Sequence, residues 1–140
     1  MSVARDFTLA VLANGLDALS ARQTAIAQNI ANVETPNYKA VDVAFERALR
    51  QALEETRRRG RGLPAQGVGR VFQEEAARLA SVRPVAFRRT QTTLRRDGNN
   101  VDIEVEMAYL AETALRFRAL STLASKKLAM LRLVAQESRF

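Results

Sequence analysis

The feature that most constrains the fold of this chain is a regular alternation of three- and four-residue steps between apolar residues near its N-terminus. Seven of the eight positions in this series are apolar. Residues at these steps share one face of an α-helix, so the series predicts an amphipathic helix over residues 3–33, about 45 Å long. The positions are Leu9, Leu12, Leu16, Leu19, Gln23, Ile26, Ile30 and Val33.

The C-terminal part of the chain repeats the same spacing over a longer stretch. Asn100 or Asp102 would cap this second long helix, and acidic residues in its opening turns suit the helix dipole. Further leucines widen the apolar face beyond a two-stranded seam, which indicates more than one packing neighbour. The seam positions are Ile103, Met107, Leu110, Ala114, Phe117, Ser121, Ala124, Leu128, Leu131 and Ala135.

Together the two series predict a mainly α fold, in which long N- and C-terminal helices pack as a coiled-coil-like hairpin. Residues 1–40 and 97–140 would form this discontinuous helical domain. An aromatic content of only 6%, against 47% apolar residues overall, also suits helices packed side by side. Apolar surface that the hairpin leaves uncovered would face other subunits. We expect the assembly seam to consist of Leu9, Leu12, Leu16, Leu19, Ile26, Ile30, Ile103, Leu110, Phe117, Leu128 and Leu131.

Between the long helices, residues 41–58 are predicted to contain a short helix. Its apolar residues recur every four positions, and it would run from Val43 to about Arg58 with Asp42 as its N-cap.

Residues 59–96 are predicted to form a basic, flexible or irregular middle segment that is partly β. We expect a glycine-containing loop over 59–70, a short helix over 71–80 and weak extended structure over 82–96. Eleven Arg and four Glu fall within residues 54–96, so this part of the chain carries the whole formal charge of +7.

Two turns flank the long helices. Pro36 ends the first helix near Thr35, and Thr35-Pro36-Asn37-Tyr38 predicts a β-turn with Asn37 at positive φ. The second turn is Asp97-Gly98-Asn99-Asn100, which directly precedes the C-terminal helix. Asn29 and Asn32 share a face at the end of the first helix, where their amides can bind free backbone carbonyls or bridge to another helix.

The composition argues against several classes of protein. The chain has no Cys and no His, so it lacks the thiolate, the commonest metal ligand and the usual general acid–base group. We therefore predict a non-enzymatic protein with no catalytic residue, cofactor site, metal site or small-molecule substrate. The sequence also contains no apolar run long enough for a membrane span and no secretory signal pattern.

The segment AQNIANVETPNYKA resembles the N-terminal signature of the flagellar rod, hook and hook-associated axial proteins. That signature combines an Ala-Asn pair, a Thr-Pro-Gly-Tyr turn and a following Lys. Asn37 departs from it where the family usually has Gly, but Asn is the next best residue at positive φ. The matching residues are Asn29, Ala31, Asn32, Thr35, Pro36, Tyr38 and Lys39.

A second segment, DGNNVDIEVEMA, resembles the proximal rod proteins of this family, in which DGNNVD and VEMA lead into the C-terminal helix. The assembly residues that we carry over from it are Gly98, Asn99, Asn100, Val101 and Met107. The resemblance covers roughly residues 9–45 and 97–135.

The resemblance implies a self-assembling structural subunit of the bacterial flagellar proximal rod, part of the drive shaft and export conduit. It implies type III export without a cleaved signal peptide, followed by assembly in the periplasmic part of the basal body. The implied partners are copies of the chain itself, other proximal rod proteins, the hook–basal-body adaptor protein, the MS ring and the export gate.

Two alternative functions remain open on the residues alone. The Arg-rich middle would suit a basic nucleic-acid-binding protein, although only Phe72 and Phe87 lie among its arginines as stacking groups. The heptad helices alone would equally suit a soluble coiled-coil adaptor. A long amphipathic helix is marginal by itself in water, so for a rod subunit we expect folding coupled to assembly.

Overall fold

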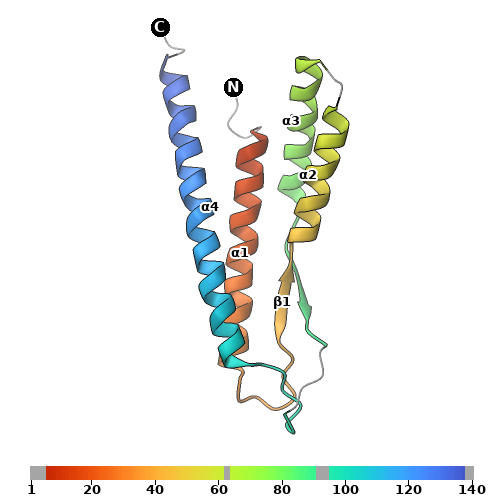
Figure 1. Cartoon of the computed structure of the whole chain (residues 1–140), viewed down its shortest axis with the longest axis vertical. Helices are drawn as coiled ribbons and strands as arrows, with labels where there is room; N and C mark the ends of the chain where they lie inside the picture. The colour runs from red at the N-terminus through yellow and green to blue at the C-terminus, as the bar shows by residue number, and fades with distance from the viewer. Residues whose placement is uncertain (1–5, 62–63, 91–94, 138–140) are drawn as a thin grey trace. The chain divides into compact units, whose positions relative to one another are not determined.

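The computed structural model describes residues 6–61, 64–90 and 95–137. It confirms the predicted class: the chain is mainly helical, with long helices at both ends, a short two-stranded sheet and an irregular middle (Figure 1). The elements in chain order are α1 (Phe7–Ala31), β1 (Val41–Ala44), α2 (Glu46–Gly60), α3 (Ala65–Ser81), β2 (Val85–Arg88) and α4 (Ile103–Glu137).

The chain divides into two compact units, and both long helices contribute to each of them. The first unit contains Met1–Leu16, Glu46–Arg83 and Ala119–Phe140. The second unit contains Asp17–Phe45 and Pro84–Arg118. The second unit therefore holds both sequence motifs and the sheet, and the first holds the α2–α3 pair.

The sheet of the second unit is an antiparallel pair in which Val41 lies opposite Arg88 and Ala44 lies opposite Val85. Our prediction of a helix starting at Val43 with Asp42 as its cap was wrong, because Val41–Ala44 is a strand and α2 begins only at Glu46. Alternating apolar residues explain this outcome: Val43 is buried, whereas Ala44 on the other face is exposed.

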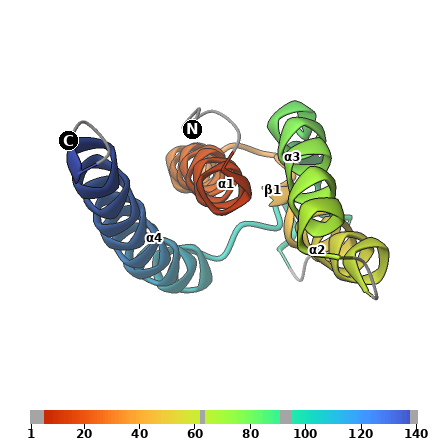
Figure 2. The same ribbon diagram turned by 90° about the horizontal axis from the view of Figure 1, so that it is seen from above.

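In the first unit, α2 and α3 form an antiparallel helical hairpin (Figures 1 and 2). Its interior includes the fully buried Leu79, together with Val71 and Ala76. An ion pair crosses the hairpin, because Arg59 of α2 lies 2.8 Å from the Glu74 carboxylate and also contacts the buried Glu75. Arg59, which was predicted to lie in a flexible or irregular segment, is therefore part of an ordered ion pair.

The connection between α2 and α3 is shorter than the predicted loop over 59–70. Helix α2 continues to Gly60, and α3 begins at Ala65, directly after Pro64. Proline fixes φ near the helical value and needs no hydrogen-bond acceptor, so it suits this boundary. The apolar residues that α3 buries outweigh the low helix propensity of the glycines in its first turns.

Helix α1 buries more than the predicted seam. Leu12, Leu19 and Ile26 of that seam are each less than 9% exposed, and Leu9, Leu16 and Ile30 are half-buried. An adjacent row of small and polar residues is buried as well. This row consists of Gly15, Ala18, Ala25 and Asn29.

Small size matters most at Gly15, because a Cβ atom there would lie 2.8 Å from Leu120 Cδ1 within the first unit. The same unit has an ion pair between Asp6 and Lys127, whose Nζ atom is 3.0 Å from the carboxylate. Asp6 also caps α1, since its side chain accepts a hydrogen bond of 3.1 Å from the Leu9 amide.

Helix α4 leaves much of its apolar surface in contact with water. Of its predicted seam residues, Leu110, Phe117 and Leu131 are half-buried, whereas Ile103, Met107 and Leu128 are exposed. The exposed large apolar residues of α4 are Ile103, Val105, Met107, Tyr109, Leu115, Leu123, Leu128, Met130, Leu133 and Val134. None of the helices in the described part of the chain combines the length and apolar character needed to span a bilayer.

Candidate assembly site

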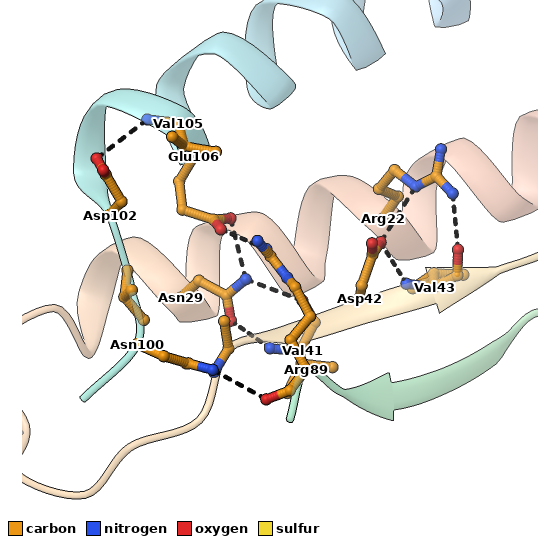
Figure 3. Close-up of polar contacts among 12 residues, drawn as sticks. Arg22, Asn29, Val41, Asp42, Val43, Arg89, Asn100, Asp102, Val105 and Glu106 are labelled. Carbon is orange, nitrogen blue, oxygen red and sulfur yellow. Dashed lines mark hydrogen bonds and ion pairs between the residues drawn. The ribbon is translucent and has the colours of Figure 1, made fainter. Parts of the chain in front are cut away.

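The two sequence motifs meet in the second unit at a polar cluster that we call the polar hub. The hub consists of Asn29, Arg89, Asn99, Asn100 and Glu106. Figure 3 labels four of them: Asn29, Arg89, Asn100 and Glu106. The first of these residues lies on α1, the last on α4, and the others follow β2 or precede α4. The hub therefore links parts of the chain that are more than 60 residues apart.

Asn29 is the centre of the hub and is fully buried. Its amide nitrogen donates to the Val41 carbonyl at 2.9 Å and to a Glu106 carboxylate oxygen at 3.0 Å. Its amide oxygen accepts from the Val41 backbone at 2.8 Å and from the Tyr38 hydroxyl at 3.3 Å. All four hydrogen-bonding positions of the amide are occupied, so its burial carries no penalty for an unmet polar group.

Glu106 extends the hub into α4. Its side chain is 1% exposed and accepts hydrogen bonds from both Asn29 and the Arg89 guanidinium. Arg89 in turn lies over the Tyr109 ring, with its guanidinium carbon 5.6 Å from the ring centre. A buried carboxylate needs such partners, and removing one of them leaves an uncompensated charge.

Asn99 binds the turn that follows helix α1. Its side-chain nitrogen lies 2.9–3.0 Å from the carbonyl oxygens of Asn32, Val33 and Thr35. These carbonyls lie after Ala31, the last residue of α1, so a single buried amide holds the chain where it leaves the helix. Its own oxygen accepts from the Val101 amide at 2.7 Å, which fixes the approach to α4.

Asn100 and Lys39 join the two motifs further along. The Asn100 side chain accepts from the Ala40 amide at 2.7 Å and donates to the Arg89 carbonyl at 2.9 Å. The Lys39 ammonium donates to the Gly98 carbonyl at 2.6 Å. The small amide side chains of the two motifs therefore bind backbone groups, for which their size and their paired donor and acceptor suit them.

The predicted turn at Thr35–Tyr38 is confirmed. The Tyr38 amide donates to the Thr35 carbonyl at 3.3 Å, and Asn37 has φ 61°. The second turn lies against the first, because the Asn37 amide donates to the Asp97 carbonyl at 2.8 Å. Gly98 has φ 74°, and a Cβ atom there would lie 2.6 Å from the Asn37 side-chain oxygen. Both the backbone conformation and this close contact therefore favour glycine at position 98.

The acidic residues beside the second turn have separate tasks. Asp102 is the N-cap of α4 and accepts from the Glu104 amide at 2.9 Å, which decides between the two predicted caps. Hydrogen bonding from Arg95, followed by the Asn99 amide, lowers the pKa of Asp97 below its ordinary value of 3.8. The turn before α4 is therefore stabilised by an ionised aspartate.

The remaining motif residues lie outside the hub. Val101 is buried, whereas Ala31, Pro36 and Met107 are exposed. The Asn32 side chain donates to the Gln28 carbonyl at 2.8 Å and accepts from the Thr35 hydroxyl, so it completes the end of α1.

Sequence reasoning missed the two charged members of the hub. Glu106 was assigned only to the dipole of α4, and Arg89 only to the basic middle segment. A signal for Glu106 was present, because it precedes Leu110, Thr113 and Phe117 at helical spacing and thus begins their partly buried row. Arg89 had no comparable signal. In the described ranges, with their gaps, no group of acidic residues is arranged to hold a metal ion.

The long terminal helices and the hub that fastens them define a helical structural subunit of the flagellar axial class, and residues 9–39 match the flagella basal body rod protein family. A flagellar basal body rod protein FlgB from Borrelia hermsii is 37% identical over 71% of this chain and 74% of its own length. The Bacillus subtilis FlgB is 32% identical over 81% of both chains. This chain therefore belongs to the FlgB family of flagellar basal body rod proteins, and it is a structural subunit of that rod.

Proposed function

We propose that this rod subunit assembles through the exposed apolar surface of α4, against copies of itself and other rod proteins. Ten large apolar side chains of α4 are at least 40% exposed, and Leu115 reaches 70%. A surface of this kind on a long helix is typical of a protein-binding face. Full burial of one such side chain contributes about 1.5–3 kcal/mol, against which the ordering of the chain must be set.

In this proposal the polar hub is the joint that fixes the C-terminal end of α1 relative to the N-terminal end of α4. Its amides bind backbone groups from three separate segments, and Asn29 and Glu106 are fully buried. A satisfied buried network specifies one geometry, because every alternative leaves polar groups unpaired. A rotating shaft that transmits torque needs subunits with joints of this kind.

The finer assignments follow from the family resemblance. We place the subunit in the proximal rod, in the periplasm, after type III export without signal cleavage. There its terminal helices would surround the export conduit. Its neighbours would include other proximal rod proteins, the hook–basal-body adaptor protein, the MS ring and the export gate. We assign it no enzymatic activity, since its family is one of structural proteins.

The rival functions are less well supported. A nucleic-acid-binding role would need the arginines of the middle segment, but several of them are engaged in ion pairs within the chain. Those with an acidic partner are Arg58, Arg59, Arg78, Arg89 and Arg95. A closed coiled-coil adaptor would not leave the apolar face of α4 so widely exposed.

A charge placed in the α4 face tests the proposal. Leu128 is 48% exposed, so Leu128→Asp should leave the free subunit intact while placing a carboxylate in the buried interface. We expect this variant to be produced and exported but absent from purified basal bodies, and its host to be non-motile. Ser125→Asp, at an exposed polar position on the same helix, is the matched control and should support swimming.

The host for both variants is a strain that lacks the gene, and electron microscopy of its basal bodies provides the baseline. The wild-type chain should restore a rod to these basal bodies. Normal swimming of the Leu128→Asp strain would remove this face from the assembly mechanism.

A further inference from the structure

The two outer edges of the sheet differ in how their backbone groups are used. On the β1 side, the Asn29 amide binds both the N–H and the C=O of Val41, as a neighbouring strand would. The Arg22 guanidinium binds the Val43 carbonyl at 2.7 Å, and the Asp42 carboxylate accepts from the Val43 amide at 2.7 Å. Figure 3 shows these side chains around β1, with β2 on its other side. Side chains thus close the β1 edge.

The register then gives the direction of the groups on β2. Because Val41 and Val43 point their backbone groups away from β2, their partners Arg88 and Ala86 must point theirs away from β1. Within residues 6–61, 64–90 and 95–137, no group is bonded to these outward N–H and C=O groups of Ala86 and Arg88. The β2 edge is open in the described part of the chain.

The side chains of β2 are also exposed along its whole length. Val85 is 63% exposed and Phe87 is 46% exposed, although the two are apolar and share one face of the strand. Arg88 and the preceding Arg83 are exposed at the two ends. Proteins usually shield a strand edge of this kind, so an open edge with two apolar side chains requires an explanation.

We propose that β2 is a docking edge, to which an extended segment of a neighbouring rod protein adds as a third strand. The outward groups of Ala86 and Arg88 alternate along a straight backbone, and only another extended backbone pairs with such a row, since a helix has no free donors along its length. Val85 and Phe87 would contact apolar side chains at every second position of the segment. Arg83 and Arg88 favour acidic residues at its ends.

This inference rests on assembly into the rod, but it concerns a surface separate from the α4 face. A proline at position 86 tests it, because the Ala86 N–H points outward and proline is tolerated on an edge where its nitrogen faces away from the sheet. The variant Ala86→Pro removes one donor and blocks the approach of a third strand. Ala86→Ser keeps the donor and is the matched control.

We expect Ala86→Pro to lower incorporation into basal bodies by roughly tenfold or more, because a docked strand would lose a hydrogen bond and meet the ring. The Ser variant should incorporate normally. Circular dichroism and urea unfolding of the purified subunits verify that both variants keep the fold. Wild-type incorporation of Ala86→Pro would overturn the proposal.

Cross-linking keeps the test decisive if the proline variant proves unstable. A photoreactive benzoylphenylalanine replaces Val85 in the otherwise unchanged chain, and mass spectrometry of irradiated basal bodies identifies the attached peptide. Attachment to an extended segment of another rod protein would support the proposal. Attachment to a helix, or to β2 of a second copy, would overturn it. The Leu128→Asp result leaves this readout unaffected, so the two hypotheses fail separately.

Discussion

The side-chain amide of Asn29 donates a hydrogen bond of 3.0 Å to the carboxylate of Glu106, which lies 77 residues further along the chain. The two residues come from the two sequence motifs by which the chain resembles flagellar axial proteins. Each motif therefore has a partner in the other, and the pair explains why polar residues occupy helix positions that face the interior. Each residue would lose one of its hydrogen-bond partners in a chain that lacked the other motif.

The first prediction concerns the Asn29 amide. Replacing Asn29 with Ala leaves the Val41 N–H and C=O and one Glu106 oxygen without a partner, which should lower the free energy of unfolding by roughly 2–4 kcal/mol. Urea unfolding monitored by tyrosine fluorescence measures this change in stability, because the signal comes from the second unit, which contains Asn29. The chain has no Trp, and its two tyrosines, Tyr38 and Tyr109, both lie in the second unit.

Asn29→Asp is the informative companion variant. It keeps the size and the acceptor oxygen of the side chain but brings a second carboxylate to Glu106 and an acceptor to the Val41 carbonyl. We expect it to be at least as destabilising as Asn29→Ala at pH 7, despite its closer shape. Equal stability of Asn29→Asp and the wild-type chain would show that the bonds to Glu106 and the Val41 carbonyl contribute nothing.

Much of this region was predictable because its signals are local. Pro36 marks the end of α1, and the Thr-Pro-Asn-Tyr turn needs only the conformational preferences of its own residues. The cap at Asp102 follows from its place directly before Ile103, the first residue of α4. In each case the residue that carries the signal and the structure that it produces lie within four positions of each other.

The errors arose where two patterns overlap or where partners are distant. Phe45 is the last member of a two-residue alternation through Val41 and Val43 and the first of a four-residue series through Leu49, so the start of α2 was placed too early. The binding of Asn99 to the turn after α1 has no local signal at all, because the carbonyls that it binds are more than 60 residues away. Only the fold brings them together.

A second prediction concerns the contact between the two turns. Gly98→Ala should lower the free energy of unfolding by about 1–3 kcal/mol, because alanine disfavours positive φ and its Cβ atom would lie 2.6 Å from Asn37 Oδ1. Asn37→Gly removes that oxygen and should be nearly neutral by itself. In the double variant the clash is gone and only the strain at position 98 remains.

The double variant is therefore expected to be more stable than Gly98→Ala alone, and a double-mutant cycle by urea unfolding measures the difference. Strictly additive effects of the two substitutions would show that the turns do not restrain each other.

A third prediction concerns acid. The pKa of Asp97 is lowered below 3.8 in the folded chain, chiefly by its hydrogen bond from Arg95 and then by the Asn99 amide. A depressed carboxyl pKa adds stability that is fully present above the unfolded value and is lost as the pH falls through the folded value. Asp97→Asn retains an acceptor for the Asn99 amide, so it removes the charge with little change of shape.

We expect the wild-type chain to be more stable than Asp97→Asn at pH 7, and the difference to shrink as the pH falls below about 3.8. Unfolding midpoints in urea from pH 7 to pH 2 measure this trend. A difference that is independent of pH would assign the effect to shape and not to the charge of Asp97.

The last prediction concerns the ion pair between Glu106 and Arg89. Glu106→Gln keeps the shape of the side chain but leaves the Arg89 guanidinium, which is 20% exposed, without its carboxylate. The cost should be about 2–3 kcal/mol, somewhat below that of breaking a fully buried pair because water reaches part of the arginine. Arg89→Met leaves the opposite imbalance, a buried carboxylate held by Asn29 alone, and should cost as much or more.

The double variant Glu106→Gln with Arg89→Met contains no unpaired charge. Its loss of unfolding free energy should therefore be smaller than the sum of the two single losses by about 1 kcal/mol or more.

The same three variants also separate folding from assembly. If the hub acts as a joint, the double variant will recover stability in urea yet still support less swimming than the wild-type chain, because a neutral pair holds α4 less firmly. If the double variant recovered both stability and swimming in full, the ion pair would contribute to stability alone and not to assembly.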